Sequence, residues 1–380
     1  MKKFQNALIY VEDEGLKKCD LVFDERIREI GEGLTNAEVI PLPEGAIVLP
    51  GFIDEHIHGA GGADAMDGSY AALGTIAKAV AAEGTTSFLA TTMTQSPEHI
   101  KGALAAADEY IKNPESGARL LGVHLEGPFI AAKHKGAQPL EYVAKPSVAV
   151  FEEYQKAAGG NIKIVTLAPE EEGAGQLVAH LAAQGVIASI GHSGATHADV
   201  VAALEKGATH ITHTYNAQSP LHHREAGVVG SALLLDELSC ELIADGIHVS
   251  VPAMKLLVKC KPSDKLILIT DAIRAKGLGE GISELGGQTV YVKNGEARLK
   301  DGTLAGSVLT MNRAVQNLVE RVGVPFLQAV DCATKNPARD LNLLDEIGSI
   351  RPGKRADFTV LDEGYNVVLT VVGGKIVYRA

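Results

Sequence analysis

The sequence predicts an α/β protein, namely a (β/α)8 TIM-like barrel with a small β-sandwich domain formed from both chain termini. From residue 51 to about 345, short strand-like runs alternate with Ala-rich helical stretches, whereas both ends of the chain carry strand-like runs only. Eight strands in such an alternation is the number that a barrel of parallel strands requires, and a core of Ala, Val, Leu and Ile suits strands buried on both faces. A doubly wound open sheet is the alternative that the alternation alone leaves open.

Both ends of the chain alternate apolar and polar positions in short runs that Gly, Asn, Asp and Pro interrupt, as strands do. The Gly373-Gly374 pair between two β-branched runs predicts a hairpin near the C-terminus. We therefore expect residues 1–51 and 346–380 to form one β-domain, and residues 52–345 to form the barrel. The expected terminal strands are Ala7–Tyr10, Leu21–Phe23, Ala46–Leu49, Asp357–Leu361, Val367–Val372 and Lys375–Tyr378.

Eight strands are expected in the barrel, and helical stretches lie between most of them. The strands are Ile53–Ile57, Thr86–Ala90, Leu120–Leu125, Ile162–Leu167, Ile187–Ile190, His210–Thr212, Cys240–Ala244 and Leu266–Ile269. The clearest helical stretches are Tyr70–Ala82, Glu98–Ile111, Gln176–Gln184, His197–Lys206, Met311–Val322 and Pro325–Ala333. Thr196 is a plausible N-cap for the fourth of these, and Gly207 follows its end.

The charge and the apolar runs of the chain exclude two classes of partner. The net charge is −12 and no run of Lys and Arg exceeds two residues, which argues against nucleic-acid binding. No apolar run reaches the roughly 18 residues that a membrane span needs. We therefore expect a cytoplasmic protein with no nucleic-acid partner, no membrane partner and a small-molecule substrate.

Polar residues fall at the carboxyl ends of the predicted strands, the rim where barrel enzymes build active sites. His56 and His58 are two positions apart in a strand, so their side chains project from one face about 6.5–7 Å apart and can share a metal ion. An HxH pair alone is a weak signal, but four further residues end other strands: Glu126, His192, His213 and Asp271. Six such groups on one rim predict a metal centre.

The motifs HIHG, HLEGPF, GHS, THTYNA, HHRE, DGIHV and TDA, in this order, resemble those of the amidohydrolase superfamily. More narrowly, they resemble its amino-sugar phosphate deacetylases, and the resemblance covers essentially the whole chain. It implies hydrolytic deacetylation of N-acetyl-D-glucosamine 6-phosphate to D-glucosamine 6-phosphate and acetate in amino-sugar catabolism.

The resemblance also implies a role for each rim residue. The implied ligands of a divalent ion (Zn, Fe, Mn or Co) are His56, His58, Glu126, His192 and His213. Members that lack the HxH pair hold one ion, so the pair favours two ions per subunit over one. Asp271 is the expected general base and acid, which accepts a proton during attack of a metal-activated water and returns it to the leaving amine.

Recognition of a phosphate requires local cations in this acidic chain. By resemblance, Arg224 and His248 bind the phosphate, and Arg224 reaches across the interface of a homodimer. A guanidinium suits this task because it donates two parallel hydrogen bonds. The other residues that the resemblance places against the sugar or the phosphate are Ala137, Gln138, Asn216, Ala217, Leu304, Ala305 and Gly306.

Three departures from the family pattern border the substrate loops and affect the expected sugar selectivity. Tyr215 and Gln218 flank Asn216-Ala217 where relatives commonly read FNAM, Ala226 stands where Pro is common, and Gln138 stands where some relatives have His. The alternatives are therefore a deacetylase for N-acetylgalactosamine 6-phosphate, another amidohydrolase, or a sugar-phosphate-binding protein without catalysis. The last would require damage to the ligand set or the base, and none is present.

Overall fold

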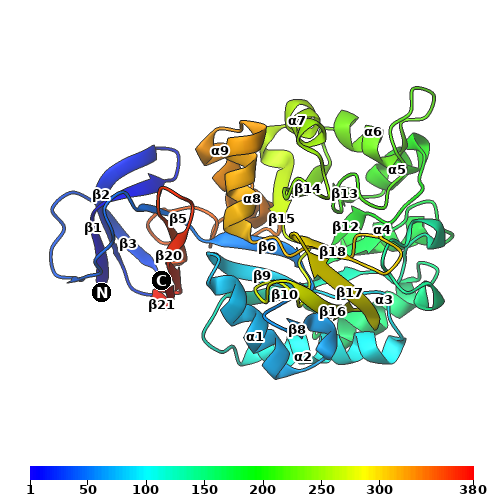
Figure 1. Cartoon of the computed structure of the whole chain (residues 1–380), viewed down its shortest axis with the longest axis horizontal. Coiled ribbons are helices and arrows are strands. Elements are labelled where there is room, and N and C mark those ends of the chain that lie inside the picture. The colour runs from blue at the N-terminus through cyan, green and yellow to red at the C-terminus, as the bar shows by residue number, and fades with distance from the viewer.

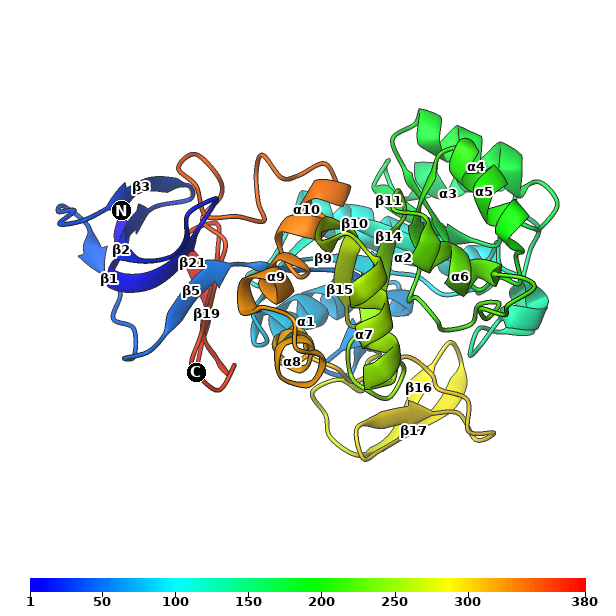
Figure 2. The ribbon, with the colours of Figure 1, turned by 90° about the horizontal axis from the view of Figure 1, so that it is seen from above.

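The chain folds into a barrel of strands and helices with a smaller, all-β domain at one side (Figure 1). The computed structural model describes all residues from 1 to 380. Viewed from above, both termini lie in the small domain (Figure 2). The chain enters the barrel through β6 (Phe52–Ile57; Figure 1). This arrangement confirms the predicted fold class.

Eight parallel strands form the barrel, and their order in the sheet follows their order in the chain. They are β6 (Phe52–Ile57), β9 (Thr85–Thr91), β10 (Arg119–Glu126), β11 (Ile162–Leu167), β12 (Ile187–Ile190), β13 (Ala208–Ile211), β14 (Ser239–Ile243) and β15 (Leu266–Ile269). The helices around them are α1 (Tyr70–Ala81), α2 (Pro97–Lys112), α3 (Val148–Ala157), α4 (Ala174–Ala183), α5 (His197–Glu205), α6 (Gly227–Leu234), α7 (Val251–Cys260), α8 (Met311–Asn317), α9 (Phe326–Asp331) and α10 (Lys335–Asp340).

Most predicted elements agree with the structure to within two residues, because their end signals are local. Thr196 caps α5, as expected: its side chain accepts a hydrogen bond from the backbone N–H of Asp199, whose carboxylate accepts in turn from the N–H of Thr196. The predicted helix Met311–Val322 is in fact α8 followed by a wider turn of π-helix from Leu318 to Val322.

The first and last strands, β6 and β15, close the barrel through bonds at its rim. The backbone N–H of Asp271 donates to the carbonyl of His56 at 2.8 Å, and the N–H of His58 donates to the carbonyl of Ala272 at 2.9 Å. Below them, the carboxylate of Asp54 accepts bonds from the hydroxyl and the N–H of Thr270 at 2.6 and 3.2 Å. Closure therefore brings His56, His58 and Asp271 side by side.

The small domain draws its strands from both chain ends, as expected. They are β1 (Lys2–Val11), β2 (Gly15–Phe23), β3 (Ile27–Gly31), β4 (Glu38–Val39), β5 (Ile47–Pro50), β19 (Phe358–Leu361), β20 (Val367–Val372) and β21 (Lys375–Arg379). They form one continuous sheet that curls on itself. Phe358 lies on β19 and Phe23 on β2, and β5 and β1 separate these strands in the sheet, yet the two rings are 5.0 Å apart. The sandwich-like core is thus enclosed by a single folded sheet.

A three-stranded antiparallel sheet interrupts the chain between β15 and α8, and the sequence analysis did not anticipate it. It comprises β16 (Gly281–Leu285), β17 (Gln288–Lys293) and β18 (Glu296–Arg298). Leu285, Val290 and Val292 pack in a separate buried cluster with Met93 and Ile273. The apolar side of this sheet therefore rests on the loops that follow the barrel strands. A further short pair, β7 (Gly59–Ala60) and β8 (Ala63–Asp64), follows β6.

Gly84 offers a test of the contact between the two domains. Its φ is +88°, and an added Cβ would lie 2.4 Å from the methyl carbon of Thr359, whose hydroxyl donates to the Gly84 carbonyl. Gly160 has nearly the same φ, +83°, but open space around it. We expect Gly160→Ala to lower the free energy of unfolding by about 1–2 kcal/mol through backbone strain alone. Gly84→Ala should cost a further ~1–3 kcal/mol because the contact must open.

Urea unfolding followed by circular dichroism measures both losses. Equal losses in the two variants would contradict the tight contact at Thr359.

Candidate functional site

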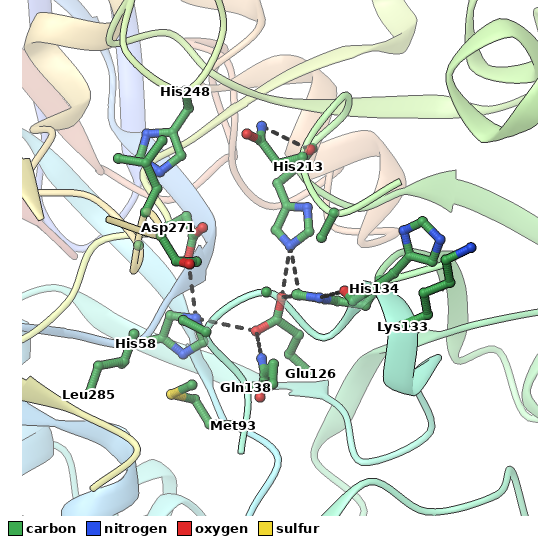
Figure 3. A pocket seen from close by; sticks show the side chains of 18 residues that line it. His58, Met93, Glu126, Lys133, His134, Gln138, His213, His248, Asp271 and Leu285 are labelled. Carbon is green, nitrogen blue, oxygen red and sulfur yellow. Dashed lines mark hydrogen bonds and ion pairs between the residues drawn. The ribbon is translucent and has the colours of Figure 1, made fainter. Parts of the chain in front are cut away.

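A cavity of about 320 Å³ opens at the carboxyl ends of the barrel strands (Figure 3). Its floor carries imidazoles and carboxylates, and its walls come from the loops after the strands and from the β16–β18 sheet. The lining residues are His58, Met93, Glu126, Lys133, His134, Gly136, Ala137, Gln138, His192, His213, Asn216, Ala217, His248, Asp271, Leu285, Thr303, Leu304 and Gly306.

One group of candidate ligands consists of Glu126, His192 and His213. Oε1 of Glu126 lies 3.1 Å from Nε2 of His192 and 3.0 Å from Nε2 of His213. The two Nε2 atoms lie 3.1 Å from each other. Glu126 ends β10, whereas each histidine follows its strand by two residues. Three atoms from three different strands therefore converge on one point.

The second group consists of His56, His58 and Asp271, which barrel closure brings together. Oδ1 of Asp271 lies 3.2 Å from Nε2 of His58 and 3.6 Å from Nε2 of His56. Glu126 faces this group as well, because its Oε2 is 3.3 Å from Nε2 of His58. Glu126 thus stands between the two groups (Figure 3), and Gln138 donates to the same Oε2 at 2.8 Å.

Three of the residues at strand ends have an unusual backbone. The φ angles of His192, His213 and Asp271 are +47°, +28° and +47°. Positive φ is uncommon for residues other than glycine and costs of order 1–3 kcal/mol per residue. Hydrogen bonds hold these turns: the carbonyl of His192 accepts from the N–H of Ala131 at 2.9 Å, and the carbonyl of Asp271 accepts from the N–H of Ser307 at 2.8 Å. Such strain is typical of functional sites.

The charges of the two groups shift one another's pKa values. Burial disfavours every charged form, but Glu241, Glu126 and Asp271 together raise the pKa of His56 to about 9. Burial also raises the pKa of Asp271, but the positive charges of His56 and His58 outweigh this effect and lower the pKa to about 2. Without a metal ion, the carboxylates of Glu126 and Asp271 therefore favour the ionised form and the imidazoles of His56 and His58 favour the protonated form.

The donor set fits a divalent metal ion. Nε2 of His56 is buried and has no hydrogen-bond partner on the protein, so its electron pair is free to bind a metal ion. The Nε2 atoms of His192 and His213 face each other, so the position between them can be filled only by a proton or a cation. Imidazole nitrogen and carboxylate oxygen are the ligands that first-row divalent ions bind. Both groups could therefore hold a metal ion.

Twelve of the fifteen residues predicted from the sequence line the cavity. The exceptions are His56, Arg224 and Ala305. His56 lies beneath the floor with none of its surface exposed, and Ala305, next to Leu304 in the chain, is also fully buried. Arg224 is exposed on the loop after β13, where its guanidinium contacts His223. Within one chain, Arg224 does not reach the cavity.

Several residues of the site were missed by the sequence analysis. Lys133, Met93, Leu285 and Thr303 line the cavity, but each belongs to a loop or sheet whose position depends on the tertiary fold. Glu241 is buried beneath the floor, 2.9 Å from Nδ1 of His56. A signal for it existed in the sequence: a charged residue in the middle of an otherwise apolar strand must have a buried partner.

The sequence profile of the Amidohydrolase family matches residues 47–377. A curated relative, the N-acetylglucosamine-6-phosphate deacetylase of Bacillus subtilis, is 47% identical over 342 residues, which cover 89% of this chain and 86% of the relative. The N-acetylgalactosamine-6-phosphate deacetylase of Escherichia coli O157:H7 is 37% identical over 359 residues, which cover 93% of this chain and 95% of the relative.

A solved structure has the same fold. The N-acetyl-D-glucosamine-6-phosphate deacetylase mutant of Mycobacterium smegmatis in complex with N-acetyl-D-glucosamine-6-phosphate superposes with a TM-score of 0.92 and 29% identity, covering 99% of each chain.

Replacing His192 by Ala tests the metal site. The loss of one direct donor should weaken binding of Zn²⁺ or Mn²⁺ by more than the roughly 10–100-fold that follows loss of an outer hydrogen-bond partner. Elemental analysis after dialysis against a weak chelator measures the metal that is retained. The matched control is His99→Ala, because His99 is exposed on α2. Equal metal content in the two variants would show that His192 is not a ligand.

Proposed function

The chain belongs to the amidohydrolase family, and from this premise we propose that it hydrolyses the acetamide bond of N-acetyl-D-glucosamine 6-phosphate. The products are D-glucosamine 6-phosphate and acetate, formed in amino-sugar catabolism. The observation that carries the proposal is the floor of the cavity, where two groups of metal-binding side chains meet at Glu126. Such a floor suits hydrolysis of an unreactive amide, and the relatives named above include deacetylases of this substrate.

His56, His58, Glu126, His192 and His213 would hold the metal, as one or two divalent ions of Zn, Fe, Mn or Co. When bound, these ions would polarise the amide carbonyl and lower the pKa of a water molecule. The buried charge favours two ions over one. Glu126, Asp271 and Glu241 bring three negative charges, so one divalent ion leaves a net negative site. Two ions leave a positive site, which suits the negative charge that develops on an amide oxygen during hydrolysis.

Asp271 would handle the proton. Its Oδ1 faces His58, and its side chain lines the cavity, so the carboxylate can reach both the attacking water and the scissile bond. The carboxylate accepts the proton that the water loses and then donates it to the amide nitrogen. Protonation is needed because an amine leaves a tetrahedral carbon poorly as an anion. Positive charge beside Asp271 lowers its pKa and so favours the ionised form that accepts a proton.

Binding of the sugar phosphate would use the cavity wall. Lys133 supplies local positive charge, and His248, whose Nδ1 lies 2.6 Å from a carboxylate oxygen of Asp245, would contact the phosphate. Arg224 lies outside the cavity of its own chain, which agrees with a role across the interface of a homodimer. Ala137, Gln138, Asn216, Ala217, Leu304, Ala305 and Gly306 would contact the sugar or the phosphate. A cytoplasmic location fits a substrate whose charge keeps it from crossing lipid.

A second candidate substrate is N-acetyl-D-galactosamine 6-phosphate, because a deacetylase of that sugar is 37% identical to the chain.

None of the helices combines the length and the apolar composition that crossing a bilayer would require.

Release of acetate from the two N-acetylhexosamine 6-phosphates distinguishes the candidates. We expect kcat/KM for the glucosamine derivative to exceed that for the galactosamine derivative by at least ~10-fold, about 1.4 kcal/mol, because the sugars differ in one hydroxyl. The measurement is an enzyme-coupled acetate assay with metal-loaded protein, with unphosphorylated N-acetylglucosamine as the control. A reversed ratio would assign the chain to the galactosamine derivative, and release from neither would refute the proposal.

Asp271→Asn tests the proton transfer. The amide keeps the shape of the side chain but cannot accept the proton, so kcat should fall by about 10²–10⁴-fold, the usual contribution of a positioned acid–base group. Calorimetric binding of the substrate should remain measurable. The matched control is Asp67→Asn, an acid outside the cavity in the 3-10 turn Ala65–Asp67 that follows β8. Turnover near the wild-type rate in Asp271→Asn would show that another group moves the proton.

A further inference from the structure

Glu241 is a buried charge that the proposed reaction does not use. It is the one charged residue of β14, between Cys240 and Leu242, and none of its surface is exposed. A carboxylate in such a place costs several kcal/mol unless it is paired. Its partners therefore indicate what the residue does.

One oxygen of Glu241 holds both groups of candidate ligands. Oε2 lies 2.9 Å from Nδ1 of His56, which belongs to the group with His58 and Asp271, and 3.0 Å from the backbone N of His213, which belongs to the group with Glu126 and His192. A carboxylate can only accept hydrogen bonds, so Nδ1 of His56 carries a proton. The free electron pair of His56 then lies on Nε2, which faces Oδ1 of Asp271 and Oε1 of Glu126, each at 3.6 Å.

The second bond supports a strained backbone. His213 has a φ of +28°, outside the ordinary regions for its residue type. Its N–H donates to the side chain of Glu241, and the N–H of Thr214 donates to the Glu241 carbonyl at 2.9 Å. Two consecutive N–H groups of this turn are thus bonded to one residue. The imidazole of His213 reaches Glu126 only because the turn holds this shape.

His124 lies beside this pair but is not part of a metal site of its own. Although His56, His124 and Glu241 are close enough to hold an ion, both ring nitrogens of His124 are already bonded. Nδ1 lies 3.1 Å from the carbonyl of Glu55, and Nε2 lies 2.7 Å from the hydroxyl of Thr166. The cluster beneath the floor is therefore a supporting hydrogen-bond network.

We propose that Glu241 is a positioning residue that fixes the ring of His56 and the turn of His213 together, and so sets how tightly the ion next to His56 binds. This inference rests on the metal binding proposed above. Outer-shell carboxylates that hold a metal-bound histidine commonly contribute a factor of about 10–100 in metal affinity. Glu241 serves both groups through one atom, so its loss should reduce occupancy at the His56 group without removing any direct donor.

The test measures metal affinity in the absence of substrate. Glu241→Gln keeps the size of the side chain but replaces a charge-assisted acceptor by a weaker one. We expect the weaker-bound Mn²⁺ or Zn²⁺ of this variant to bind about 10–100-fold less tightly than in the wild type, in competition with a chromogenic chelator. Activity measured at low metal should fall and should recover when metal is added in excess, because the direct ligands remain. A defect of folding would not recover in this way.

Glu55→Gln is the matched control. Glu55 is also a fully buried glutamate of the barrel, its side-chain oxygens have no hydrogen-bond partner, and it adjoins His56 in the chain. This variant should bind metal as the wild type does. Glu241→Leu removes both side-chain hydrogen bonds and should weaken metal binding further than Glu241→Gln does. If Glu241→Leu fails to fold, the metal affinity of Glu241→Gln alone decides the inference. Wild-type metal affinity in Glu241→Gln overturns the inference, and loss of acetate release with unchanged metal affinity overturns it as well.

Discussion

The carboxylate of Glu126 is the group on which the rest of the site depends. It is buried, and its two oxygens face four imidazoles that come from the ends of three strands. A carboxylate in this position must be balanced by positive charge, either protons on the imidazoles or a bound cation. Those two states exclude each other at the same nitrogen atoms, because a proton and a metal ion use the same electron pair. The site is thus built for exchange of protons against a divalent ion.

The barrel brings these groups together by closing on itself at the rim. Strands β6 and β15 are the first and last in the sheet, and the bonds from Asp271 to His56 and from His58 to Ala272 join them. The same bonds that close the sheet therefore set the distance between Asp271 and the histidine pair. This coupling explains why residues with positive φ are tolerated at the rim: the cost of each turn is offset by closure of the whole barrel and by contacts with buried side chains.

The barrel and the six rim residues were predictable from the sequence because the signals are local. Each strand shows its own apolar run, and each rim residue lies at the end of such a run or within two residues of it. The contribution of Glu241 was not predictable in the same way, since its partners, His56 and the backbone of His213, are far away in the sequence. The β16–β18 sheet was missed although its turns carry local signals, since Gly286-Gly287 and Asn294-Gly295 are typical hairpin turns. Its position over the cavity depends on packing against Met93 and Ile273, which no local pattern shows.

The separation between floor and walls has a consequence for selectivity. In the proposed reaction, the floor would act on the acetamide, which N-acetylglucosamine and N-acetylgalactosamine share, so it would not tell the two sugar phosphates apart. They differ in the direction of one hydroxyl, and a site discriminates such a pair only where a buried polar group is satisfied by one and left unpaired by the other. That group must stand on the wall, where Gln138, Asn216 and Thr303 present polar atoms. Relatives that act on either sugar can therefore keep the same floor, and the evolution of specificity is confined to loops that leave the barrel intact.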